Sequence, residues 1–221
     1  TMHLSAETIY ASIYVLPKGE LKKSLTSSLR RKRRYRHRKT HKTSTEYHNL
    51  PNLQSIEERP KEVETRTVAG HWEGDLILGR WKQSALGTLV ERKTRYLKLI
   101  PLGAKKDHES VRKGIAQRLN KLPLTLKQTL TWDRGVEMSS HQSLTQKTKI
   151  QVYFAHPASP WERGTNENTN MLVRDFFPKK TDFSKISRKE ILYVEKIINE
   201  RPRKTLGWKT PKEALSLELL R

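Results

Sequence analysis

The segment at residues 156–177, HPASPWERGTNENTNMLVRDFF, constrains the fold more than any other part of the chain. Pro157 and Pro160 exclude a helix at its start, because proline lacks an amide hydrogen and its ring clashes with the preceding turn. From Arg163 onward the residues permit a helix, which Pro178 must end. The segment therefore predicts a rigid turn that leads into a helix.

The predicted helix carries an acid among amides. Glu167 lies about one turn into it, and positions 167, 170, 171 and 174 share one face at helical spacing. Glu167 should therefore project beside Asn170 and Arg174, and this face has the groups to hold a cation and a phosphate chain together. A solvated surface with an acid in the first turn of the helix is the alternative, and the segment alone leaves both open.

The overall charge points to a polyanionic partner. The 221 residues include 45 Lys and Arg against 23 Asp and Glu, which gives a net charge of +22. Such an excess is typical of nucleic-acid binding, with an acidic membrane surface as the alternative. No run of about 18 apolar residues and no signal-peptide pattern is present. We therefore expect a soluble cytoplasmic protein and no membrane partner.

The sequence contains no cysteine. This excludes disulfides, zinc sites with thiolate ligands and thiol nucleophiles. Any metal ion must be held by oxygen or imidazole, so Mg²⁺ or Mn²⁺ is the leading candidate, since carboxylates suit hard cations best.

A basic run extends from Lys18 to Lys42, with twelve Lys or Arg residues and the single acid Glu20. Like charges at this density repel one another, which predicts an extended or partly helical, largely disordered arm. Phosphate contact independent of base sequence is its expected role, and a solvated or localisation-type run is the alternative. The densest part supplies the candidate DNA-binding residues Arg30, Arg31, Lys32, Arg33, Arg34 and Arg36.

The order of predicted elements indicates an α/β fold. Ser5 should cap a helix over 6–16 that Pro17 ends. Three closely joined strands follow, then a helix, a strand, a helix, a strand and further helices, which fits a mixed sheet flanked by helices. The predicted strands cover 72–78, 85–91, 96–102, 126–132 and 150–155, and the predicted later helices lie at 108–122, 140–147, 191–198 and from 210.

Two more acids stand out against this pattern. Asp75 lies in the first strand between apolar neighbours, and Asp133 lies where the fourth strand gives way to a loop, the position at which open α/β sheets bind ligands. Glu73, on the same strand face as Asp75, and Glu137, close to Asp133, are the alternative candidates. Carboxylates gathered with Glu167 around one site would repel unless cations compensated them, which favours Mg²⁺ binding.

Five motifs carry a resemblance to a known family. They are GHWEGDLI at 70–77, GTLVERKTRY at 87–96, LTWDRGVEM at 130–138, SPWERGTNENTN at 159–170 and NERPRKTL at 199–206. In this order they resemble the DDE transposases of the bacterial insertion-sequence-thirty family, within the integrase-core superfamily. The resemblance runs from about residue 57 and includes SAETIY at 5–10. It implies a ribonuclease H-like fold with an acidic triad of Asp75, Asp133 and Glu167.

The resemblance also implies an activity. DNA would be cut at element ends and joined to target double-stranded DNA with Mg²⁺ or Mn²⁺ held by the triad, and the protein would act as a homo-oligomer. Arg163, Asn170 and Arg174 would join the basic arm in contacting DNA. A non-catalytic, decayed DNA-binding protein and a basic RNA-associated protein are the alternatives.

The same resemblance suggests a domain layout. Residues 1–17 would be a remnant of an N-terminal helix-turn-helix DNA-binding region, with an arm packed on the core as the alternative. Residues 18–64 would be the basic arm and linker, and residues 65–221 the integrase-like catalytic core with C-terminal helices. Met171 and Lys180 stand where the family usually has glycine.

Overall fold

A computed structural model describes residues 4–29 and 52–220, which belong to two compact units, 1–43 and 44–221. The candidate arginines and lysine at 30–36 lie outside the described residues. No helix in the two described stretches has both the length and the apolar character needed to cross a membrane.

The first unit contains two helices, α1 (Ala6–Val15) and α2 (Glu20–Ser28). Ser5 caps α1 as predicted, since its hydroxyl accepts a hydrogen bond from the Thr8 amide at 3.0 Å. Lys22 Nζ, from α2, donates to the carbonyls of Tyr14 and Leu16 at 2.9 and 2.7 Å. The start of the basic run is therefore helical and satisfies carbonyl groups at the end of α1.

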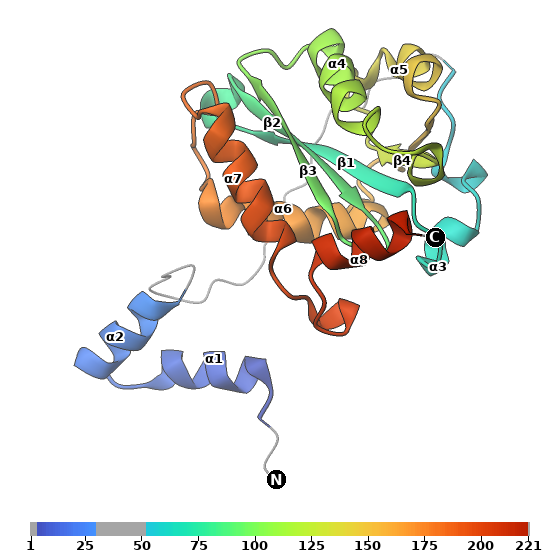
Figure 1. Ribbon diagram of the computed structural model, residues 1–221. Helices are drawn as coiled ribbons and strands as arrows, with labels where there is room; N and C mark the ends of the chain where they lie inside the picture. The colour runs from blue at the N-terminus through green and yellow to red at the C-terminus, as the bar shows by residue number, and fades with distance from the viewer. Residues whose placement is uncertain (1–3, 30–51, 221) are drawn as a thin grey trace. The chain divides into compact units, whose positions relative to one another are not determined.

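The second unit is built on a five-stranded mixed sheet with the order β3-β2-β1-β4-β5 (Figure 1). The first three strands form the predicted antiparallel meander, and β4 and β5 run parallel to β1. The bounds are β1 His71–Leu78, β2 Ala85–Glu91, β3 Leu97–Gly103, β4 Thr129–Trp132 and β5 Gln151–Phe154. The predicted mixed sheet is confirmed.

Helices cover both faces of this sheet (Figure 1). α4 (His108–Leu119) and α5 (His141–Thr148) pack on one face, and α6 (Gly164–Phe176) and α7 (Arg188–Asn199) pack on the other. The short α3 (Glu62–Thr65) precedes β1, and α8 (Pro211–Leu219) begins with Thr210 as its cap and Pro211 in its first turn, as predicted.

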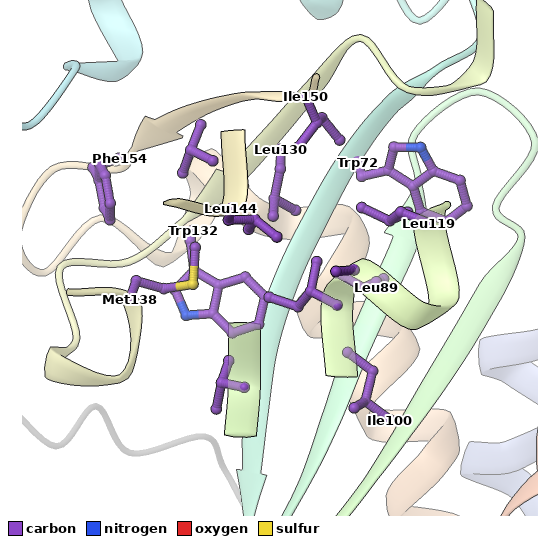
Figure 2. Close-up of a cluster of buried hydrophobic side chains, with 14 residues drawn as sticks. Trp72, Leu89, Ile100, Leu119, Leu130, Trp132, Met138, Leu144, Ile150 and Phe154 are labelled. Carbon is purple, nitrogen blue, oxygen red and sulfur yellow. The ribbon is translucent and has the colours of Figure 1, made fainter. Parts of the chain in front are cut away.

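The core under α4 and α5 explains which way β1 faces (Figure 2). Trp72 and Trp132 are fully buried in it. Gly74 leaves room for the Trp132 ring, because a Cβ at Gly74 would clash with that ring. Even-numbered residues of β1 therefore face α4, and the odd-numbered residues, including Asp75, face α6.

Polar side chains of α7 hold it against the edge strand β3. Asn199 accepts from the Leu97 amide and donates to the Leu97 carbonyl, both at 2.8 Å, and Glu195 accepts from the Leu99 amide at 2.5 Å. These bonds satisfy backbone groups that an exposed edge strand would leave open. The apolar contacts beneath them come from Leu86, Val90, Leu97, Val173, Ile191 and Ile198.

Candidate active site

Two parallel strands bring polar residues together on the face covered by α6. Glu73 of β1 pairs in register with Thr131 of β4, so Asp75 and Asp133 each lie two residues further along neighbouring strands. Asp133 directly follows the last residue of β4, as predicted. Strand alternation and parallel pairing together therefore position these two carboxylates.

Arg163, immediately before α6, joins the two carboxylates. Its Nη2 lies 3.2 Å from Asp133 Oδ2, and its Nη1 lies 3.4 Å from Asp75 Oδ1 and donates to the Gly74 carbonyl at 3.0 Å. Its side chain is only 12% exposed. The sequence predicts that Arg163 contacts DNA phosphates, and in this structure its guanidinium pairs with Asp75 and Asp133, two of the predicted catalytic acids.

Two further predicted residues of α6 also contact β1. Asn170 Nδ2 donates to Asp75 Oδ2 at 2.8 Å, and its buried Oδ1 has no hydrogen-bond partner among the described residues. Arg174 donates to the carbonyl of Leu78 at 2.7 Å and to that of Pro178 at 3.3 Å. Asn170 therefore contacts the Asp75 carboxylate directly, whereas Arg174 holds the C-terminal end of β1.

Glu167 lies in the first turn of α6 with an exposed side chain. It lies close enough to Arg163 to help raise the pKa of that guanidinium. Within residues 4–29 and 52–220, no three His, Asp or Glu side chains form a group that could hold a metal ion. The structure thus brings Asp75 and Asp133 together around Arg163, and Glu167 does not complete a three-carboxylate cluster with them.

Glu73, the alternative to Asp75, makes contacts that stabilise the fold. It is fully buried and pairs with Arg92 at 2.6 Å. Its Oε2 accepts from the backbone amide of Asn166 at 2.8 Å, and its carbonyl accepts from the Asn166 side chain at 2.9 Å. Glu73 therefore fixes the first turn of α6 to β1. Sequence reasoning did not identify Arg92 or Asn166, and only the amide-rich run around Asn166 hinted at such a role.

Glu137, the alternative to Asp133, accepts a hydrogen bond from Trp132 Nε1 at 3.1 Å. Burial and the nearby charge of Asp133 raise the pKa of Glu137. Glu137 therefore lies near the Asp133 carboxylate, where a second negative charge is disfavoured.

Burial and charge act against each other in the shared site. Burial, with a further contribution from Asp133, raises the pKa of Asp75 to about 6, although Arg163 opposes the shift. Burial alone would lower the pKa of Arg163, but Asp75 and Asp133 outweigh it and the pKa is raised. The pair of acids therefore favours a positive charge between them.

Residues 66–160 match the family model described as "Integrase core domain". This stretch of the chain is similar to integrase core domains. The match includes Asp75 and Asp133, and Glu167 lies beyond it. The matched segment thus coincides with the sheet, α4 and α5, and includes the strands that position the two paired carboxylates.

Curated relatives extend the similarity beyond the integrase core. The chain is 43% identical over 215 residues to the transposase for insertion sequence element IS1086 of Cupriavidus metallidurans, and 42% identical over 217 residues to transposase InsI for insertion sequence element IS30A of Escherichia coli. Each alignment covers 97% of this chain, but only 63% and 56% of the respective relative. The predicted resemblance to insertion-sequence-thirty transposases is confirmed.

Among solved structures, a chain of the simian T-cell lymphotropic virus intasome in complex with PP2A regulatory subunit B56 gamma has a similar fold. The TM-score is 0.53 at 15% identity, over 66% of this chain and 54% of that chain. At this identity the likeness concerns the fold alone, and it agrees with the predicted ribonuclease H-like architecture.

Proposed function

We propose that the protein is a transposase that cleaves DNA at the ends of an insertion sequence and transfers the strand into target DNA. This proposal rests mainly on one observation. Asp75 and Asp133 lie at adjacent parallel strands of the segment that matches the integrase core domain, and both contact the guanidinium of Arg163. The similarity to named insertion-sequence transposases supports the same activity. Its setting would be the cytoplasm, on DNA of the nucleoid.

The residues of the site suit a hard divalent cation such as Mg²⁺ or Mn²⁺. The available donors are carboxylate oxygens, together with the buried Asn170 Oδ1 that has no partner in the described part of the chain. The site also favours positive charge, because Arg163 is held there by two acids. Oxygen donors and excess negative charge are the features that such cations prefer.

We assign Asp75 and Asp133 as residues that would hold the cations, and Glu167 as the third ligand, although it is exposed and does not cluster with them in this structure. When bound, such ions would activate the attacking oxygen and stabilise the leaving one. Asn170 orients Asp75 through their hydrogen bond, and Glu73 seats the turn of α6 that bears Glu167. Arg163 would exchange its carboxylate partners for a DNA phosphate once cations neutralise the acids, and the basic arm would hold the DNA backbone.

Asp133→Asn tests this assignment. The substitution preserves side-chain size and removes the negative charge, so cleavage and joining should be lost while DNA affinity persists or rises slightly. Strand cleavage and joining would be measured with Mg²⁺ on DNA carrying the element's ends, beside the parent chain. Equal cleavage by the two proteins would refute the role of Asp133.

A non-catalytic DNA-binding protein is the second candidate function. It is favoured by the ion pairs of Arg163, which place one positive charge against both carboxylates. Under this alternative neither the parent nor Asp133→Asn cleaves DNA, and Mn²⁺ stabilises neither protein. A preference for RNA over duplex DNA of the same length would favour the RNA-associated alternative.

A further inference from the structure

A pocket of about 220 Å³ lies beside the N-terminal half of α6. Thr165 and Thr169 of α6 line it, whereas Asn166 and Asn170 contact β1. α6 therefore borders both the pocket and Asp75, but it does so with different residues. Its full lining is Arg66, Arg95, Gly164, Thr165, Asn168, Thr169, Arg203 and Thr205. We refer to it as the arginine pocket.

The arginine pocket has three guanidinium groups and no carboxylate in its lining. Arg66, Arg95 and Arg203 form no ion pair with any described residue, although Arg92, Arg118 and Arg163 each pair with an acid. Arg95 donates instead to the Thr165 hydroxyl at 2.7 Å, and Arg203 to the Ile198 carbonyl at 3.3 Å. The buried Nε of Arg203 has no partner among the described residues. The pocket lining therefore holds three guanidinium groups that form no ion pair with a described carboxylate.

The arginines also act on one another. Burial lowers the pKa of Arg95, and the charge of Arg66 lowers it further. Burial lowers the pKa of Arg203 as well, with contributions from Arg201 and Arg95. An anion between these side chains would relieve their repulsion and pair with donors that are only partly used.

Backbone conformation makes this placement more specific. Arg66 has φ +57° and Arg95 has φ +61°, both in the left-handed region that favours glycine or asparagine. Arg66 ends α3 and Arg95 lies in the β2–β3 turn, so two separate turns place arginine at such positions around one pocket. Gly164 and Thr165 add the positive end of the 13-residue helix α6.

We propose that the arginine pocket binds one backbone phosphate of the nucleic acid on which the protein acts. The inference rests on the proposed function, because α6 borders both this pocket and the Asp75 site. It also gives a role to the NERPRKTL motif, whose Arg203 reaches the pocket. A phosphodiester supplies the single negative charge and the acceptor oxygens that a cluster of guanidinium groups recognises.

Duplex binding at several salt concentrations tests the pocket. We would compare the parent with Arg66→Gln, Arg203→Gln and the double variant, in EDTA so that no cleavage occurs. Arg188→Gln is the matched control, because Arg188 is exposed on α7 and does not line the pocket. Losing one phosphate contact should reduce the slope of log affinity against log salt by about 0.9, which corresponds to roughly eightfold weaker binding at 0.1 M salt.

The double variant is the decisive protein. Two arginines that share one phosphate should together cost about one contact, so its slope should fall by about 0.9. A fall of about 1.8 would mean two independent surface contacts and would overturn the shared pocket, as would variants indistinguishable from Arg188→Gln. Arg66 is exposed, so the Arg66→Gln result remains informative if Arg203→Gln fails to fold.

Inorganic phosphate separates a backbone phosphate from a free anion. It should raise the melting temperature of the parent and of Arg188→Gln, but not that of the double variant. If this effect disappears in the double variant while the DNA slope is unchanged, the pocket binds a free anion and the assignment to nucleic acid is wrong. A parent chain that binds DNA but never cuts it would contradict the proposed catalysis and leave the pocket result intact.

Discussion

Arg163 Nη2 lies 3.2 Å from Asp133 Oδ2, so the residue that opens α6 neutralises the acid at the end of β4. The same guanidinium reaches Asp75 at 3.4 Å. A divalent cation at this site would compete with Arg163 for both carboxylates. The site therefore has two possible arrangements. In one, the ion pairs of Arg163 close it, and in the other, Arg163 has released both acids and the site is ready for DNA.

Arg163→Gln should increase the affinity of the site for Mn²⁺. Removing a competing positive charge about 3–4 Å from the carboxylates is worth about 1 kcal/mol even at the dielectric constant of water, or roughly a fivefold gain. The rise in melting temperature with Mn²⁺ would measure it, with Arg188→Gln as the control. Weaker Mn²⁺ binding than in the parent would contradict competition at this site.

Asp75→Asn should stabilise the metal-free protein at neutral pH. The folded-state pKa of about 6 exceeds the ordinary value of 3.8, so ionising Asp75 costs folding free energy as pH rises from about 4 to about 6. The full shift corresponds to about 3 kcal/mol, and about 1–2 kcal/mol is expected because the side chain is 26% exposed to screening solvent. Thermal unfolding in EDTA should show the gain at pH 7.5 and little difference at pH 4.

Glu73→Gln should have the opposite effect on stability. It leaves Arg92 buried without its ionic partner, which costs about 3 kcal/mol or more. Denaturant unfolding at pH 7.5 would measure this loss, with Asp75→Asn as the matched carboxylate-to-amide variant on the same strand face. A Glu73→Gln protein as stable as the parent would show that Glu73 is not the structural anchor of α6.

Period-two alternation places Glu73 and Asp75 on one face, but it cannot distinguish their roles. The distinction comes from Arg92 and Asn166, which are 19 and 93 residues from Glu73 in sequence. Elements with strong local sequence signals, such as the capped helices and the antiparallel meander, were predictable because the same local residues drive their formation. Contacts between distant side chains were not.

The partners of Arg163 could not be predicted from the sequence either. An arginine in a basic chain reads as a phosphate contact, and only the parallel pairing of β1 with β4 reveals its two acidic partners. Lys180, predicted to replace a family glycine, has φ +75°, so the structure gives a physical reason for glycine at that position. The sequence alone identified position 180 as unusual but could not predict its backbone conformation.

Deleting Lys18 to Lys42 should weaken binding to unrelated DNA sequences almost equally. Its charges are expected to release counterions from phosphates and to read little base information. The slope of log affinity against log salt should therefore become shallower, by about 0.9 for each lost phosphate contact. A chain in which the same arginines and lysines are shuffled within the segment is the control and should bind as the parent does. An unchanged slope on deletion would remove the arm from the interface.

Glu167→Gln should abolish strand cleavage and joining while leaving the fold intact. Glu167 is exposed in the first turn of α6, so losing its charge should change stability by less than about 1 kcal/mol through the helix dipole. Glu190→Gln is the matched control, because Glu190 is also exposed in the first turn of a helix, α7. We expect Glu190→Gln to cleave as the parent does. If Glu167→Gln also retains full cleavage and Mn²⁺ stabilisation, then Glu137, already close to Asp133, becomes the third carboxylate to test.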